Sequence, residues 1–153
     1  MSTSLTLQEQ HQIVYQASRH ELVVPWSTRK RRLEQLQALL KTHQHTLLAA
    51  IAADFGQRSA TESTILELIP ANNAIKHALK HGEKWMQRRK AATSWLFKPA
   101  TAYVQPQPKG VIGIVSPWNY PLYLIIGPLV DAFVAGHRAM VNISEHVPQF
   151  AAT

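Results

Sequence analysis

Two histidines of the chain have a spacing that could bind a metal ion. His77 and His81 stand four residues apart, which places both imidazoles on one face of a helix. Three lysines, Lys76, Lys80 and Lys84, surround the pair and would repel a cation. No Asp, Glu or Cys joins the histidines at ligand spacing. We therefore interpret them as surface side chains.

Two runs of cations could bind an anionic partner such as nucleic acid. They are Arg29–Arg32 and Arg88–Lys90, and they account for much of the net charge of +7. The whole surplus lies in residues 1–98, whereas residues 99–153 carry no net charge. Aromatic side chains that would stack on bases do not alternate with these cations. We therefore interpret the two runs as solvated helix ends. The alternative is that they belong to a basic helical module that binds an anionic partner.

The amino-acid composition limits the chemistry that this chain can perform alone. Its 153 residues are 46% hydrophobic and 16% charged, which is typical of a globular protein. The sequence has no cysteine. A disulfide framework, a cysteine zinc site, an iron–sulfur cluster and a cysteine nucleophile within these residues are thereby excluded.

One segment, Gln107–Pro121, carries the most specific motif. It contains the run Val111–Val115 followed by Ser-Pro-Trp-Asn-Tyr-Pro, and Gly127-Pro128-Leu129 stands further along. This segment resembles the aldehyde dehydrogenase superfamily. The upstream Asp54-Phe55-Gly56 and the stretch Lys76–Met86 are most similar to its coniferyl aldehyde dehydrogenase branch. The resemblance runs from about Ile13 to about Pro148 and corresponds only to the N-terminal portion of a family member.

The resemblance implies a reaction and a role for one asparagine. Family members oxidise an aldehyde to a carboxylic acid with NAD or NADP, through a cysteine thiolate that adds to the carbonyl. Asn119 matches the asparagine whose side-chain amide holds the oxyanion of the adduct. A neutral, preorganised donor suits this task because negative charge develops on the aldehyde oxygen.

The resemblance also implies cofactor contacts. The segment that lines the nicotinamide ribose matches Val115, Ser116, Pro117 and Trp118. Glu145 matches the acid that accepts hydrogen bonds from the adenosine ribose. Asn142 stands where the family usually has a lysine, so it can offer a hydrogen bond but no cation. His137 stands where asparagine is usual.

The remaining catalytic groups of the family match no residue of this chain. The cysteine nucleophile and the general-base glutamate would both follow Thr153, so we expect the chain alone to be inactive. For a full-length member the resemblance implies a small-molecule aldehyde substrate and a homo-oligomer in the cytoplasm. An alternative is a non-catalytic remnant that associates with full-length subunits.

The elements that must position these residues fall into three regions. Residues 1–98 are predicted to be helical. The first helix spans 8–22, the second begins after an N-cap at Ser27, and the third begins at a capping box formed by Ser59 and Glu62. Pro70 should kink the third helix or mark a 3₁₀ turn. Residues 99–109 form an extended linker, and we expect short extended segments over 93–97 and 101–105.

Residues 110–153 are predicted to begin a dinucleotide-binding domain. The β-branched run 111–115 is typical of a buried parallel strand, 121–135 of a helix, and 138–144 of a second strand. The fold class is therefore α/β: a helical layer, then the first strand–helix–strand of an incomplete Rossmann-like sheet. Residues 145–153 lead into a further helix. Residues 110–130 carry no charge, but Pro117, Pro121 and Pro128 argue against a membrane span.

Overall fold

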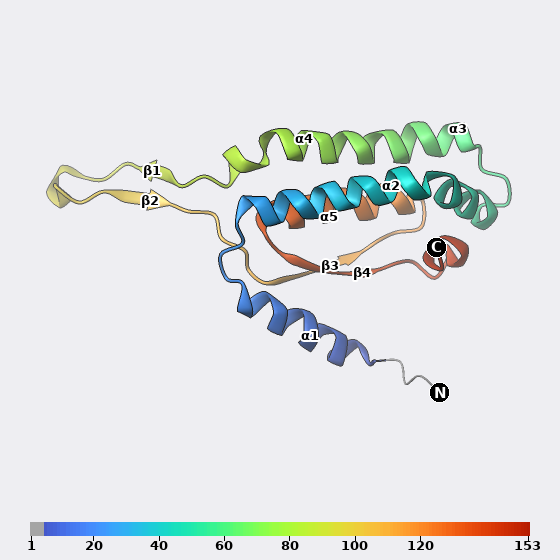
Figure 1. Cartoon of the computed structure of the whole chain (residues 1–153), viewed down its shortest axis with the longest axis horizontal. Coiled ribbons are helices and arrows are strands. Elements are labelled where there is room, and N and C mark those ends of the chain that lie inside the picture. The colour runs from blue at the N-terminus through green and yellow to red at the C-terminus, as the bar shows by residue number, and fades with distance from the viewer. Residues whose placement is uncertain (1–4) are drawn as a thin grey trace.

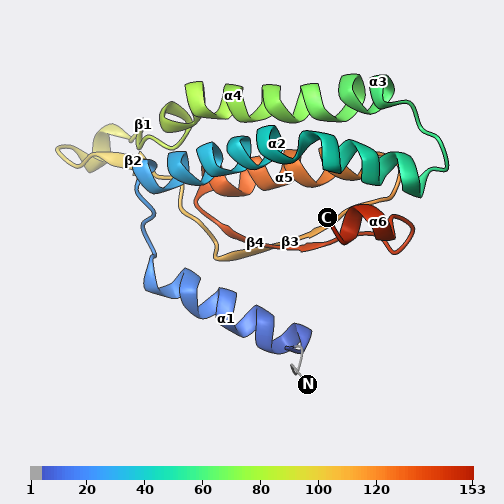
Figure 2. The same cartoon turned by 45° about the vertical axis from the view of Figure 1, so that its right-hand side comes forward.

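The computed structural model describes residues 5–153 as stacked layers (Figures 1 and 2). Three long helices pack together, α5 lies against one face of a two-stranded sheet, and α1 lies on the other face. The α-helices are α1 (Leu7–His20), α2 (Trp26–Asp54), α3 (Ala60–Ser63), α4 (Ile69–Trp85), α5 (Pro121–Ala135) and α6 (Pro148–Ala151). The strands are β1 (Arg89–Ala91), β2 (Ala102–Val104), β3 (Val111–Val115) and β4 (Arg138–Asn142).

The sheet is the predicted strand–helix–strand unit. Strand β3 pairs in parallel with β4, from Val111 opposite Arg138 to Val115 opposite Asn142, and α5 connects the two. Pro121 opens α5, where its missing N–H leaves no helical bond unmade. Gly136 ends the helix in the left-handed conformation. The α/β prediction is confirmed, and the last predicted helix corresponds to α6.

The core lies between α2, α4 and α5. The leucines of α2 recur at helical spacing, and this apolar stripe is buried against the other two helices. Helix α2 continues without interruption through its polar stretch at residues 42–45. The buried side chains of the core include Leu33, Leu36, Leu40, Leu47, Ile51, Leu68, Ala71, Ile75, Leu122, Ile126, Val130 and Phe150.

Two predicted helix starts are wrong in detail. Helix α2 begins at Trp26, and its N-cap is Pro25, two residues before the predicted N-cap Ser27. At α3, Ser59 is the N-cap, but its side chain makes no capping bond. Glu62 turns instead toward Arg58, with 3.5 Å between Oε1 and Nε, because a cation one helical turn away attracts the carboxylate.

Between α3 and α4 the helix contains one widened turn. Residues Thr64–Leu68 form a π-helical turn, and Pro70 lies in the first turn of α4, so a wider turn stands where a 3₁₀ turn was one of the two predictions. The extra residue rotates the flanking side chains. Ile65 is 56% exposed, whereas Glu67 is fully buried.

A hairpin arm projects from the body (Figure 1). Strand β1 pairs antiparallel with β2, from Arg89 opposite Val104 to Ala91 opposite Ala102. At its tip, Trp95–Phe97 form a 3₁₀ turn rather than the extended segment predicted over 93–97, because the side chain of Ser94 accepts a bond from the Leu96 N–H. Within residues 5–153, no helix is long and apolar enough to cross a membrane.

Replacing Gly136 with alanine should destabilise the fold. Its φ is +88°, and a methyl group there would lie 2.9 Å from Arg29 Cζ. The left-handed backbone and the overpacking together should lower the unfolding free energy by about 2–4 kcal/mol. Urea unfolding measures this loss. Gly127→Ala is the control, because its methyl group would meet only Tyr123 at 4.0 Å. A loss no larger than that of the control would contradict the prediction.

Candidate active site

The turn that follows β3 lies at the carboxyl edge of the sheet. The Ser116 N–H donates to the Asn142 carbonyl at 3.0 Å, and Val115 stands opposite Asn142 in the sheet register. Three predicted cofactor residues are thus brought together at the edge where open parallel sheets bind ligands. Val115 is 78% exposed there, and Asn142 is also exposed.

Asn119 faces an open pocket beside this edge. The pocket has a volume of about 610 Å³ and lies between the turn and the segment that joins α2 to α3. Asn119 itself is exposed, so its amide is accessible from solvent. Aromatic rings form much of the wall, and those of Phe55 and Trp118 lie 6.1 Å apart between centroids. The lining residues are Phe55, Gly56, Gln57, Arg58, Glu62, Trp118, Asn119 and Tyr120.

Arg58 holds the backbone of the turn. Its Nη1 donates to the Asn119 carbonyl oxygen at 2.7 Å. The guanidinium carbon lies 4.9 Å from the Phe55 ring centroid and 4.5 Å from that of Tyr120, so the planar group is held against two aromatic rings. Only 6% of the Arg58 side chain is exposed. A buried guanidinium in this position keeps little rotational freedom.

Glu67 joins Arg58 to the start of α5. Its Oε2 accepts the Leu122 N–H at 2.8 Å and the Tyr123 N–H at 3.5 Å, two amides that the first turn of a helix leaves unpaired. Its Oε1 lies 3.4 Å from Arg58 Nη1. Burial raises the pKa of the Glu67 carboxyl, and the Leu122 N–H and Arg58 offset that effect only in part.

Glu67 should make stability depend on pH. Because the pKa of its carboxyl is higher in the folded state than the ordinary value of 4.5, the folded protein binds this proton more tightly than the unfolded chain does. Stability should therefore fall as pH rises from that ordinary value through the raised pKa. Urea unfolding across about pH 5–8 should show this fall in the difference between the wild type and Glu67→Gln. A difference that is flat or rises with pH would refute it.

Glu145 follows β4 and does not line the pocket that Asn119 faces. Its side chain is 85% exposed, and its Oε1 lies 3.9 Å from Nε2 of His146. Within residues 5–153 no hydrogen bond joins Glu145 to the turn after β3. Its carboxylate is open to solvent, as a ribose-binding acid must be before the ligand arrives. Its cofactor role remains a prediction.

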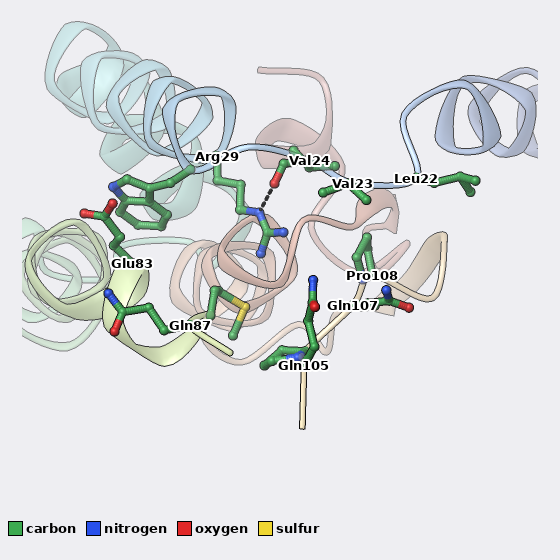
Figure 3. A pocket seen from close by; sticks show the side chains of 12 residues that line it. Leu22, Val23, Val24, Arg29, Glu83, Gln87, Gln105, Gln107 and Pro108 are labelled. Carbon is green, nitrogen blue, oxygen red and sulfur yellow. Dashed lines mark hydrogen bonds between the residues drawn. The ribbon is translucent and has the colours of Figure 1, made fainter. Parts of the chain in front are cut away.

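The first basic run does not form a continuous solvated surface, whereas Arg88, Arg89 and Lys90 of the second run are exposed. Arg29 is buried and donates from Nε to the Val24 carbonyl at 2.8 Å (Figure 3). Its Nη1 donates to the Val134 carbonyl, also at 2.8 Å. Arg32 bonds to Glu21 at 3.2 Å. The view of them as solvated helix ends is therefore wrong for Arg29. In the second run, the Arg88 guanidinium carbon lies 3.4 Å from the Tyr103 ring centroid.

The histidine pair stacks with an aromatic neighbour. The rings of His77 and His81 lie 4.7 Å apart between centroids, and His77 lies 5.3 Å from Trp85. Within residues 5–153, no three metal-ligating side chains cluster there or elsewhere. Burial and the nearby His77 lower the pKa of His81.

Arg58 and Glu67 are the residues of this site that sequence reasoning missed. Glu67 stands inside the apolar run Ile65, Leu66, Leu68 and Ile69, and a lone acid in such a run indicates a buried carboxylate with a partner. Arg58 gave a weaker signal, because its spacing to Glu62 also fits an ordinary surface pair.

Comparison with known proteins agrees with the motif. The aldehyde dehydrogenase family model matches residues 7–153. A probable coniferyl aldehyde dehydrogenase of Pseudomonas aeruginosa is 45% identical over 116 residues, which are 76% of this chain and 24% of that protein. The coniferyl aldehyde dehydrogenase of a Pseudomonas species is 36% identical over 121 residues, which are 79% of this chain and 25% of that protein.

Solved structures show the same fold. The substrate-bound AldH of Staphylococcus aureus matches 97% of this chain and 32% of its own, with a TM-score of 0.86 and 26% identity. Succinic semialdehyde dehydrogenase of Streptococcus pyogenes, solved with NADP⁺, matches 99% of this chain and 33% of its own, with a TM-score of 0.79 and 20% identity. The chain spans about a quarter of the length of its curated relatives. It belongs to the aldehyde dehydrogenase family and corresponds to the N-terminal part of those relatives.

Proposed function

We propose that the complete protein oxidises an aromatic aldehyde of the coniferyl type to its acid with NAD or NADP. The observation that carries this proposal is the pocket in which Asn119 stands among aromatic walls. Phe55, Trp118 and Tyr120 offer flat apolar surfaces that suit an aryl ring. The similarity to two coniferyl aldehyde dehydrogenases supports the same substrate class.

Asn119 supplies the electrophilic assistance in this proposal. Its side-chain amide donates a hydrogen bond to the aldehyde oxygen, and the bond strengthens as that oxygen gains negative charge. Because an amide is neutral, the donor keeps its protonation state across the working pH range. The nucleophile comes from outside these residues, since the chain has no cysteine.

The carboxyl edge of the sheet suits a dinucleotide. When bound there, NAD or NADP accepts the hydride that leaves the substrate. Val115, Ser116, Pro117 and Trp118 offer backbone groups along the edge, Asn142 offers an amide, and Glu145 offers a solvent-exposed carboxylate. A carboxylate favours ribose hydroxyls over a 2′-phosphate, which is an anion.

Activity of a joined enzyme tests the proposal. Residues 1–153 are fused to the C-terminal remainder of the P. aeruginosa relative, and reduction of NAD or NADP is followed with coniferyl aldehyde and with an aliphatic aldehyde. We expect turnover and a higher kcat/KM for the aromatic substrate. The 153-residue chain alone should show none, because it has no thiolate. A folded fusion that binds cofactor but leaves the aromatic aldehyde unreacted overturns the proposal.

The hairpin arm supports self-association of the complete protein. Trp95, Leu96 and Phe97 at its tip are 78%, 69% and 66% exposed, a cluster of large apolar side chains that a partner subunit would cover. We infer a homo-oligomer. Light scattering of the joined enzyme should show a dimer or larger species, and Phe97→Ser combined with Trp95→Ser should shift it toward the monomer. A monomeric joined enzyme contradicts this inference.

A further inference from the structure

We propose that Arg58 and Glu67 are positioning residues that set the location of Asn119 for the reaction. This inference rests on the proposed function. Neither side chain is placed to react with an aldehyde: Glu67 is fully buried, and Arg58 is committed to the Asn119 carbonyl. Both would act through the backbone of the turn that carries the oxyanion donor.

The turn is fixed at both of its ends and at its middle. At the β3 end, the Ser116 N–H donates to the Asn142 carbonyl at 3.0 Å. At the α5 end, Glu67 accepts the Leu122 N–H at 2.8 Å. Between them, only one side chain holds the Asn119 backbone among the described residues, and it is Arg58, at 2.7 Å. The position of the Asn119 amide therefore depends on Arg58.

Glu67 sets the position of Arg58 in turn. The distance of 3.4 Å from its Oε1 to Arg58 Nη1 places the negative charge beside the same nitrogen that reaches Asn119. The rings of Phe55 and Tyr120 hold the guanidinium from two directions. One carboxylate thus supports the turn twice, through the α5 amides and through Arg58.

The widened helical turn gives Glu67 this direction. Each residue of an α-helix advances the side-chain direction by about 100°. The extra residue in Thr64–Leu68 therefore turns Glu67 toward α5, while Ile65 points to solvent. Single π turns of this kind occur often at functional sites. Here the turn serves the placement of a buried acid.

Kinetics of the joined enzyme test the positioning role. Arg58→Lys keeps the charge but loses the planar fork, and Glu67→Gln keeps an acceptor for Leu122 but loses the charge. We expect each to lower kcat by about 10- to 100-fold with the KM for cofactor unchanged, since a small misplacement of a catalytic group has an effect of this size. Glu34→Gln is the control, because Glu34 also pairs with a cation, Lys30, but is 53% exposed and does not line the pocket. Its kcat should stay within about twofold of the wild type.

A double-mutant comparison separates positioning from general folding damage. In the Asn119→Ala background, Arg58→Lys should lower kcat by less than about threefold, because the group that it positions is already absent. An equal loss of kcat with and without Asn119 overturns the proposal, as does a wild-type kcat in Arg58→Lys. The melting temperature of each variant is measured alongside.

Amide exchange in the 153-residue chain keeps this inference distinct from the proposed function. Hydrogen exchange of residues 116–123 should become about tenfold faster in Arg58→Lys and in Glu67→Gln, and remain unchanged in Glu34→Gln. If every form of the joined enzyme is inactive, the hydrogen-exchange measurement still tests the positioning contacts. Faster exchange supports the positioning contacts even though the proposed function has failed, and unchanged exchange overturns them.

Discussion

Replacing Asn119 with alanine should lower the kcat of the joined enzyme by about 10²- to 10³-fold, the loss found when one oxyanion donor is removed. The bond forms fully only in the transition state, so the KM for aldehyde should change far less than kcat. Asn119→Asp should be at least as damaging, because its carboxylate would repel the developing negative charge. Steady-state reduction of the cofactor with coniferyl aldehyde gives both constants.

Asn142→Ala is the matched control for this experiment. It removes the same type of side chain from the same edge of the sheet, but at the position that we assign to the cofactor. We expect it to raise the KM for NAD or NADP and to leave kcat within a few-fold of the wild type. An Asn119→Ala enzyme that loses less kcat than Asn142→Ala contradicts the assignment of the oxyanion donor.

Replacing Arg29 with leucine should produce the largest loss of stability. The substitution removes two charge-assisted bonds, each of 2.8 Å, and leaves the buried carbonyls of Val24 and Val134 without their donor. At about 1.5–3 kcal/mol for each bond to a charged group, the free energy of unfolding should fall by about 3–6 kcal/mol. Burial lowers the pKa of Arg29, but an arginine stays charged at any physiological pH.

Urea unfolding compares this variant with Arg31→Leu. Arg31 belongs to the same run of cations but is exposed, so its loss should change the unfolding free energy by less than about 0.5 kcal/mol. Arg29→Lys should recover only part of the stability, because an ammonium cannot reach both carbonyls with the planar geometry of a guanidinium. Equal losses for Arg29→Leu and Arg31→Leu would show that the two carbonyls have other partners.

The sheet and α5 were predictable from sequence because their signals are local. A β-branched run, a proline at a helix start and a glycine at a helix end each report the conformation of their own residues. The bounds 121–135 for α5 match the structure, and the second strand ends at Asn142, two residues before the predicted Ser144. The side chain of Asn119 was identified from the motif rather than from its surroundings.

The partners of the groups around Asn119 were not predictable, because they are distant in sequence. The ion pair between Arg58 and Glu67 depends on a π turn, which no residue pattern announced. The π turn also leaves two apolar side chains of this region in solvent, since Ile65 and Ile69 are 56% and 48% exposed. Arg29 looked like a surface cation, since its carbonyl partner at Val134 is 105 residues away.

The separation of Arg29 and Val134 in the sequence also affects how the chain folds during its synthesis. Helix α2 is complete long before α5 leaves the ribosome, so Arg29 and the leucine stripe have no α5 to pack against during that interval. At about 5–20 residues per second, the 105 residues between the two partners take about 5–20 s to add. During this delay the nascent helix presents an apolar face and a cation, which is the kind of surface that a chaperone binds.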